Sequence, residues 1–444
     1  MLLPINPKNI NTIKNPVFRE YVQSYNDIYE DFQRQIQSYG LPISEKPYLS
    51  VHDAQIDKLR QKGLVIANNH KSLSVGFLSP SCETCRKGMN TATFLISVQC
   101  PRNCYFCFNP NQQDYKYYLY NKRNLIEELN NHYKKGVVYK DLALTGGEPL
   151  MHKDETEAFF QHAKKLYPKA YTRLYTCGAF LDEQFLKKLN KAGLDEIRFS
   201  IKMEDTPAEQ KAILRKLKLS KSYLPRVLVE MPVLPDNLEQ MKNLLLALER
   251  IGIDGINLLE FCFPYHNVKD FALRGYRLKQ EQYRVLYNYS YAGGLPIGGS
   301  EENCLLLLIF AVQNKLKIGV HYCSLENKHT GQIYLQNFPF RHAFKNCLMS
   351  QKDYFLKSAK VFGSEVSSIE KLFRKAGLQA YEKEPQLQYL EFPVSYLAIL
   401  KKEAPTLEVG ICYHIVENRD GINVLRELRV DLTTPSQIDL KNDI

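Results

Sequence analysis

The chain has 444 residues, of which 44% are hydrophobic and 24% are charged, and its net charge is +11. This is the composition of an ordinary globular protein, and the length allows a large core domain with one or two accessory regions. A membrane-spanning protein is excluded at this level, because the longest apolar run, 304–312, is far too short to cross a bilayer.

The N-terminus and the cysteine content together predict a soluble cytoplasmic protein. The first residues lack the charged and apolar segments of a signal peptide. Eleven cysteines, an odd number, favour reduced thiols and metal ligation over a disulfide framework. The basic excess is spread along stretches such as 210–221, which favours solvated helix faces. A path for an acidic peptide or for nucleic acid is the alternative, and nucleic acid is the less favoured partner.

The first predicted element is a helix over 17–39. Apolar and aromatic residues recur in it at helical spacing: Phe18, Tyr21, Val22, Tyr25, Ile28, Tyr29 and Phe32. We expect an amphipathic helix that packs on the core. A docking surface for a substrate peptide is the alternative.

A Cys-x2-Cys pair follows at Cys82 and Cys85. Such a pair supplies half of a metal site, so a complete site needs partners from elsewhere in the chain. The candidates are Cys323, within the His-Tyr-Cys-Ser sequence at 321–324, and Cys347 further on. Two interpretations stay open: a second metal or cluster site that includes Cys82, Cys85 and Cys323, or reduced cysteines that serve packing.

Three more cysteines, Cys100, Cys104 and Cys107, have the spacing C-x3-C-x2-C and follow the apolar, β-branched run 93–98. Three thiolates on one short loop can hold one face of a [4Fe–4S] cluster, which normally takes four cysteines. One iron is then left without a protein ligand, as a catalytic centre requires. A zinc site or chance clustering is less favoured, because no second half with paired cysteines follows nearby.

From residue 93 the chain alternates between short apolar strands and amphipathic helices. The predicted strands are 93–98, 141–145, 172–176, 196–201, 227–231 and 255–260. The predicted helices are 125–135, 155–166, 183–192, 208–218 and 238–251. Several of these helices end in a glycine just before the next strand. Repeated strand–helix units imply a parallel sheet with right-handed crossovers, and chemistry is expected at the C-terminal strand ends.

Candidate site residues lie at these strand ends. The second strand runs into Gly146, Gly147, Glu148 and Pro149. The two glycines let the backbone approach a ligand closely, and Glu148 offers an acceptor for a cation. Glu230 alternates with apolar neighbours in the fifth strand, so it points into the barrel or serves as a paired carboxylate at the strand end.

The three-cysteine loop and the Gly-Gly-Glu-Pro sequence resemble the motifs of the radical S-adenosylmethionine (SAM) superfamily. Phe106 fills the aromatic position before the last cysteine of the family signature. The resemblance implies a partial (β/α)6 TIM-type barrel, and a [4Fe–4S] cluster on the three cysteines whose open iron chelates SAM. The family's reduced cluster cleaves SAM to methionine and a 5′-deoxyadenosyl radical.

The resemblance also implies SAM contacts. Residues 146–149 match the sequence that binds the SAM ammonium group, and Ser200 matches a serine that contacts the ribose or carboxylate. Phe106 and Glu230 are further candidates for cofactor binding. Two positions depart from the family pattern: Lys202 stands where aspartate is common, and Cys177 stands where asparagine is usual. Cys177 is either a core thiol or a residue that faces the site.

Beyond residue 261 the pattern is less regular. We predict a helix over 302–315, a strand over 318–323, a helix over 361–380, and strands over 387–392, 409–416 and 424–430. The last elements predict a small α+β C-terminal domain. His414, in its middle strand, is expected to be a core or surface histidine rather than a ligand.

The expected organisation has three parts. They are an N-terminal helical extension with the Cys-x2-Cys pair over 1–90, a core barrel over 91–300 and a C-terminal accessory region over 301–444. The order of the cysteine motifs resembles a poorly characterised branch related to glycyl-radical-enzyme activases, in which some relatives modify proteins or peptides.

The resemblance implies an enzyme that reductively cleaves SAM and abstracts hydrogen from a peptide or protein side chain. It also implies an electron donor such as a flavodoxin or ferredoxin. The alternatives are a glycyl-radical-enzyme activase, an RNA-modifying radical SAM enzyme and a non-catalytic metal-binding protein.

Overall fold

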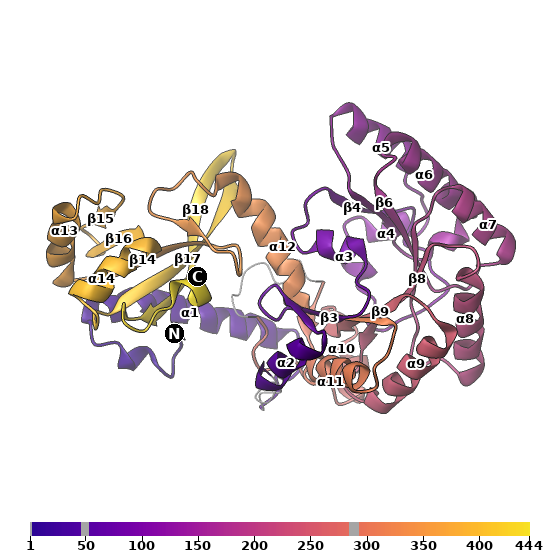
Figure 1. The fold of residues 1–444 in the computed structure, drawn as a ribbon, viewed down its shortest axis with the longest axis horizontal. Coiled ribbons are helices and arrows are strands. Elements are labelled where there is room, and N and C mark those ends of the chain that lie inside the picture. Colours follow the sequence, from indigo (N-terminus) through magenta and orange to yellow (C-terminus); the bar gives the residue numbers. More distant parts are fainter. Residues whose placement is uncertain (1, 46–52, 284–292) are drawn as a thin grey trace. The chain divides into compact units, whose positions relative to one another are not determined.

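The computed structural model describes residues 2–45, 53–283 and 293–444 (Figure 1). Residues 46–52, in the expected N-terminal extension, and 284–292, in the expected core barrel, lie outside the described residues. The chain divides into two compact units. The barrel unit contains the described residues of 40–282 and 289–329, and the terminal unit contains those of 1–39, 283–288 and 330–444. The start of the chain therefore groups with its end.

The barrel unit is built on a nine-stranded sheet in the described residues, with the order β2-β3-β12-β9-β8-β7-β6-β5-β4. The parallel strands are β4 (Thr91–Leu95), β5 (Asp141–Thr145), β6 (Tyr171–Thr176), β7 (Glu196–Phe199), β8 (Arg226–Val233), β9 (Gly255–Glu260) and β12 (Gly319–Cys323). β3 (Ser72–Val75) pairs antiparallel with β12, and β2 (Val65–Ala67) pairs antiparallel with β3. The α/β class is confirmed, and β12 continues the parallel sheet beyond the six strands predicted for it.

Helices cross from each strand to the next and follow one another along the outside of the sheet (Figure 1). They are α5 (Leu125–Lys134), α6 (Lys153–Leu166), α7 (Glu183–Lys191), α8 (Pro207–Ser220), α9 (Leu238–Ile251) and α11 (Ser300–Gln313). α8 begins with a capping box between Thr206 and Glu209. α9 ends where Gly252 adopts a φ of 74°, which glycine reaches without a steric penalty.

The barrel unit also contains short elements. They are α2 (Asp53–Leu59), α3 (Pro80–Cys85), α4 (Tyr115–Tyr118), α10 (Val268–Leu273), β10 (Cys262–Phe263) and β11 (Leu295–Pro296). α12 (Leu325–Asn337) begins in the barrel unit and ends in the terminal unit. In the described part of the chain, no helix is both long and apolar enough to span a membrane.

The terminal unit contains an antiparallel sheet with the order β1-β18-β17-β14-β16-β15, and β13 pairs with β14. Its strands are β1 (Leu3–Pro4), β13 (Leu348–Met349), β14 (Leu356–Phe362), β15 (Glu382–Glu384), β16 (Tyr389–Pro393), β17 (Val409–Arg419) and β18 (Ile422–Thr433). Its helices are α1 (Pro16–Ser38), α13 (Glu365–Lys375), α14 (Leu397–Glu403) and α15 (Leu440–Asp443). The helix predicted over 361–380 is therefore shorter, because its first two residues belong to β14.

Helices cover both faces of this sheet. On one face Phe18 of α1 is fully buried and stacks on Phe362 with ring centroids 4.4 Å apart. On the other face Phe373 of α13 packs edge-on against Phe392 of β16 at 4.9 Å. Each helix thus buries one apolar stripe against the strands, as the spacing in α1 predicts.

Candidate active site

The three cysteines of the C-x3-C-x2-C sequence lie on the loop that leaves β4. The loop turns where the Cys107 amide donates to the Cys104 carbonyl at 3.0 Å. Two side chains from the segment after β10 hold its backbone: His266 Nε2 lies 2.8 Å from the Cys107 carbonyl, and Asn267 donates to another loop carbonyl at 2.9 Å. Cys100 is exposed, the other two are half-buried, and all three are free thiols.

The chemistry of these thiols fits a bound cluster. Burial raises the pKa of Cys100 and of Cys107, and the charges of the neighbouring cysteines raise it further. Thiols on one short loop need a cationic centre to offset their charges when they ionise together. A [4Fe–4S] cluster held by three cysteines meets that need.

Gly146 and Gly147 lie where the loop after β5 passes the base of the cysteine loop. The Gly147 amide donates to the Ser97 carbonyl at 3.0 Å, and the Glu148 amide donates to the Gln99 carbonyl at 2.7 Å. A Cβ on Gly147 would lie 1.9 Å from the Gln99 oxygen, and a Cβ on Gly146 would lie 2.5 Å from the Ser97 oxygen. Only glycine allows this approach, so the Gly-Gly step fixes Glu148 against the residue that directly precedes the first cysteine.

Glu148 is buried, with 2% of its surface exposed. One carboxylate oxygen accepts from Thr176 Oγ1 at 2.7 Å and from the Leu150 amide at 3.0 Å. The other accepts from the Cys177 amide at 2.6 Å. The Cys177 thiol also lies beside this carboxylate, whose negative charge can still pair with a cationic ligand group.

Phe106 forms one wall of a recess at the ends of β7 and β8. Its ring packs edge-on against Phe261, with centroids 5.6 Å apart. The other lining residues are Ile201, Lys202, Met203, Glu204, Met231, Pro232 and Leu234. The recess is narrow, with room for about one water molecule, and it lies beside the cysteine loop.

Cys177 and Ser200 lie at the ends of neighbouring strands. Ser200 is exposed, and its amide donates to the Thr176 carbonyl at 2.9 Å. Burial raises the pKa of Cys177 to about 12, and the nearby charges of Glu148 and Cys100 add to the shift. Cys177 is therefore a half-buried thiol at the site rather than a remote core residue.

Sequence reasoning missed the ion pair between Arg102, on the cysteine loop, and Asp205, after β7. It also missed Asn109, whose side chain donates to the Gly146 carbonyl at 2.7 Å. Both contacts join segments that are distant in sequence, and neither residue type has a local pattern that marks it. The pairs hold the cysteine loop against the strand ends.

Glu230 points into the barrel and is paired there. One of its oxygens lies 2.5 Å from Arg198 Nη1 and accepts from Asn257 Nδ2 at 2.7 Å. Burial alone would raise the pKa of Glu230, but the charge of Arg198 and the Asn257 hydrogen bond outweigh it and hold the pKa below its usual value. Its neighbours Met231 and Pro232 line the recess, whereas Glu230 belongs to a polar network inside the barrel.

The same network includes Cys82. Its thiol accepts from Arg198 Nη2 and Asn257 Nδ2, both at 3.4 Å. Cys85 is exposed on the same short helix, α3. Burial raises the pKa of Cys323 to about 12, and the charges of Cys85 and Cys82 add to the shift, so the three predicted thiols lie near one another.

His321, next to Cys323 in β12, has both ring nitrogens engaged. The side-chain nitrogen of Asn257 donates to Glu230. The side-chain oxygen of Asn257 therefore faces His321 and accepts from its Nδ1 at 3.0 Å. The other ring nitrogen accepts from Ser72 Oγ at 2.9 Å. Burial, followed by the charges of Arg198 and Arg86, lowers the pKa of His321 to about 3. This neutral histidine is fixed by hydrogen bonds.

Comparison with known proteins finds similarity over part of the chain, including the segment that carries this site. Residues 94–248 match the family model of the Radical SAM superfamily. A protein of Methanocaldococcus jannaschii named as a glycyl-radical enzyme activating enzyme is 29% identical over 256 residues, which cover 55% of this chain and 63% of that protein. A PqqA peptide cyclase of Gluconobacter oxydans is 32% identical over 105 residues, covering 24% of this chain and 28% of the cyclase. The chain thus spans less than two thirds of the length of either relative.

Two solved structures show a partial likeness. Streptococcus suis SuiB bound to S-adenosylmethionine has 13% sequence identity and a TM-score of 0.41, covering 59% of this chain and 58% of SuiB. The radical SAM methyltransferase TsrM from Kitasatospora setae has 16% identity and a TM-score of 0.32, covering 44% of this chain and 40% of TsrM.

Proposed function

We propose that this chain, in which residues 94–248 form a radical SAM domain, is an enzyme that reductively cleaves SAM and abstracts hydrogen from a peptide or protein side chain. The observation that carries the proposal is the close contact between the Gly-Gly-Glu turn and the base of the cysteine loop. There a Cβ on Gly147 would lie 1.9 Å from the Gln99 oxygen. The contact holds the cluster-binding thiols and the SAM-binding turn in one fixed geometry.

In this proposal Cys100, Cys104 and Cys107 hold the [4Fe–4S] cluster. When bound, the cluster and SAM supply a carbon-centred radical that takes a hydrogen atom from the substrate. The chain itself supplies position and excludes water. The negative charge of Glu148 pairs with the ammonium group of SAM.

A polypeptide substrate is the choice that the relatives favour. One relative is named as a peptide cyclase, and another is named as an activating enzyme for glycyl-radical enzymes, whose substrate is a protein. Activation of a glycyl-radical enzyme is therefore the second candidate function. Both functions place a polypeptide segment next to the recess.

The cluster assignment is tested by anaerobic purification and reduction of the full chain. Cys104→Ala should lower the iron content and abolish the release of 5′-deoxyadenosine from SAM, because one of three thiolate ligands is lost. Iron analysis and chromatography of the products measure both effects. Cys304→Ala, which changes a buried cysteine of α11, serves as the matched control and should keep both. Normal turnover in Cys104→Ala would rule out the ligand assignment, and a wild-type protein that binds iron but releases no 5′-deoxyadenosine would indicate a non-catalytic protein.

The substrate class is tested with deuterium. The reduced enzyme is given SAM and either a deuterated peptide digest or deuterated RNA, and 5′-deoxyadenosine is analysed by mass spectrometry. We expect deuterium in 5′-deoxyadenosine from the peptide digest, because hydrogen abstraction transfers the label. Label from RNA alone would overturn the polypeptide assignment.

The second cysteine site stays a prediction, supported by the proximity of Cys82, Cys85 and Cys323. If they bind a second cluster, the double variant Cys82→Ala, Cys85→Ala should contain less iron per chain than the wild type while still cleaving SAM. An unchanged ratio of iron to protein would instead leave these residues as packing and hydrogen-bonding thiols.

A further inference from the structure

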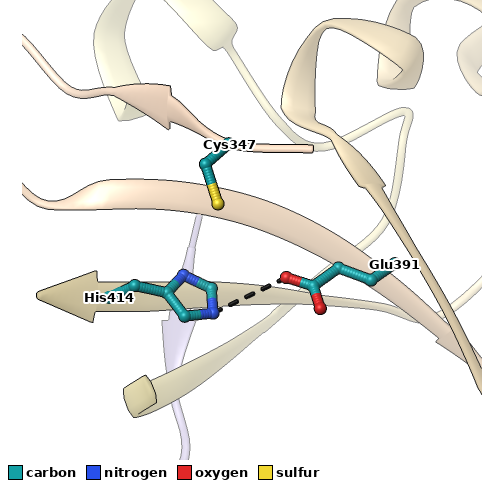
Figure 2. Close-up of side chains that lie close together, drawn as sticks. All are labelled: Cys347, Glu391 and His414. Carbon is teal, nitrogen blue, oxygen red and sulfur yellow. Dashed lines mark ion pairs between the residues drawn. The ribbon is translucent and has the colours of Figure 1, made fainter. Parts of the chain in front are cut away.

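A second group of metal-ligating side chains lies in the terminal unit. Figure 2 shows Cys347, Glu391 and His414 directed toward a common point. One ligand atom from each residue lies within 4.8 Å of the other two. Cys347 directly precedes β13, Glu391 is in β16 and His414 is in β17, so three separate segments converge. In the part of the chain that the structure describes, no other three histidine, cysteine or acidic side chains bring their ligand atoms this close together.

The histidine is oriented as a ligand. His414 Nδ1 lies 3.1 Å from the Leu356 carbonyl, which can only accept, so this nitrogen carries the hydrogen. The lone pair of a neutral ring is then on Nε2, which faces a Glu391 oxygen at 3.6 Å and a Glu427 oxygen at 3.2 Å. A lone pair that faces two carboxylates is repelled by them, so this arrangement calls for positive charge at Nε2, which either a proton on that nitrogen or a bound metal ion would supply. Metal-bound histidines commonly donate their other ring N–H to a backbone carbonyl in this way.

The surrounding charges leave a place for a divalent ion. Glu427 is satisfied within the protein, because Lys360 Nζ lies 2.6 Å away and Tyr21 and Tyr25 of α1 donate to it at 2.8 and 2.6 Å. Glu391 accepts from Ser358 Oγ at 2.6 Å, and Lys360 is further from it, at 3.7 Å. With a neutral His414, two carboxylates and one ammonium leave one negative charge in a buried place, and a Cys347 thiolate would add a second. A divalent cation would neutralise both.

We propose that Cys347 Sγ, Glu391 and His414 Nε2 bind one zinc ion in the terminal unit, with a fourth position open to water or to another ligand. Cysteine sulfur, histidine nitrogen and carboxylate oxygen are all zinc ligands, and a thiolate disfavours magnesium and calcium. The ion would tie the segment before β13 to two strands of the sheet. The site is independent of the cluster, and it gives His414 a ligand role that the sequence did not predict.

The first test measures metal in the intact protein. The full chain is produced with added zinc, purified without oxygen with its cluster, and analysed for zinc and iron together. We expect about one zinc per chain in addition to the iron. Zinc K-edge absorption should show one sulfur at about 2.3 Å with nitrogen and oxygen at about 2.0–2.1 Å. Protein without zinc, or zinc with no sulfur neighbour, would overturn the proposal.

The second test locates the ion. Cys347→Ser and His414→Gln should each lose zinc to a mild chelator at least tenfold more readily than the wild type, while the iron content stays the same. His342→Gln, at an exposed histidine in the same segment, is the matched control and should keep zinc. The double variant Cys82→Ala, Cys85→Ala should also keep it, which separates the two sites.

Cys347 is only half-buried and serine preserves its shape, so this variant remains informative if His414→Gln fails to fold. Zinc retention equal to the wild type in Cys347→Ser would overturn the site. So would loss of zinc in the Cys82 and Cys85 double variant alone.

Discussion

At the scale of single residues, Gly147 links the two motifs of the barrel unit. The Gly147 amide donates to the Ser97 carbonyl at 3.0 Å, so the backbone of Gly147 lies against the segment that precedes Cys100. Because Gly147 has no side chain, the backbone of Gln99, directly before Cys100, can lie against it. The sequence predicted a close approach of this backbone to a ligand, and in the structure the closest neighbour is the cysteine loop itself.

Gly147→Ala should therefore act on the cluster. The new Cβ would overlap the backbone oxygen of Gln99 at 1.9 Å, and a backbone atom cannot turn aside as a side chain can. We expect a loss of bound iron and of SAM cleavage, measured as iron per chain and 5′-deoxyadenosine per chain. Gly252→Ala, where no atom lies within 4 Å, is the control; its left-handed φ of 74° should cost about 1–2 kcal/mol of stability, with iron retained. A fully iron-loaded Gly147→Ala protein would show that the approach does not position the loop.

His321 gives the barrel unit a pH dependence. Its pKa in the folded chain is about 3, because burial disfavours the charged ring, whereas an unfolded histidine titrates near about 6.5. Between these values the unfolded chain binds more protons, so stability is full above about pH 6.5 and falls as the pH drops toward 3. His321→Gln should flatten part of this slope, measured by denaturant unfolding at pH 7 and pH 5. An equal slope in both proteins would assign the acid sensitivity to other groups.

At the scale of elements, the predictions succeeded where the signal was local. β5 and β9 have the predicted bounds, because apolar runs end at clear breaks in the sequence. β14 was missed, since its sequence Leu-Lys-Ser-Ala-Lys-Val-Phe places two lysines in a buried strand. Lys357 lies 2.9 Å from Asp353, and Lys360 lies 2.6 Å from Glu427. The fold brings Glu427 to Lys360 from a distant strand, so the residue types along this segment cannot show that pair, whereas Asp353 lies only four residues before Lys357.

The packing of α1 on the terminal sheet gives a prediction for this element. Phe18→Ala should destabilise the terminal unit by about 3–5 kcal/mol, because the ring is fully buried and its removal leaves a cavity against Phe362. Hydrogen exchange should show faster exchange in β14 and β17 and unchanged protection in the barrel strands. Ile28→Ala, at a position of the same helix that is 46% exposed, should leave the exchange nearly unaltered. Faster exchange across the barrel strands instead would contradict the assignment of α1 to the terminal unit.

At the scale of the whole molecule, the chain forms two compact units, and the division into three segments at residues 90 and 300 stays a prediction. The sequence showed that α1 is amphipathic. An apolar stripe can pack on any apolar surface, so the sequence did not identify the surface that α1 contacts. Its partners lie at the other end of the chain: the Asn15 side chain donates to the Phe362 carbonyl across 347 positions of sequence. The cysteine motifs needed no such information, because three ligands on one loop and the Gly-Gly-Glu-Pro turn are each contained in a few consecutive residues.

The pairing of α1 with β14, β17 and β18 sets an order of assembly during translation. A ribosome adds about 5–20 residues per second, so the first helix emerges tens of seconds before the strands that cover it. The barrel unit can fold in that interval, whereas the terminal unit closes only after β18 has been made. In a stalled or prematurely stopped chain the apolar face of α1 would stay exposed. Chaperones would bind such a chain, and proteases would cleave it.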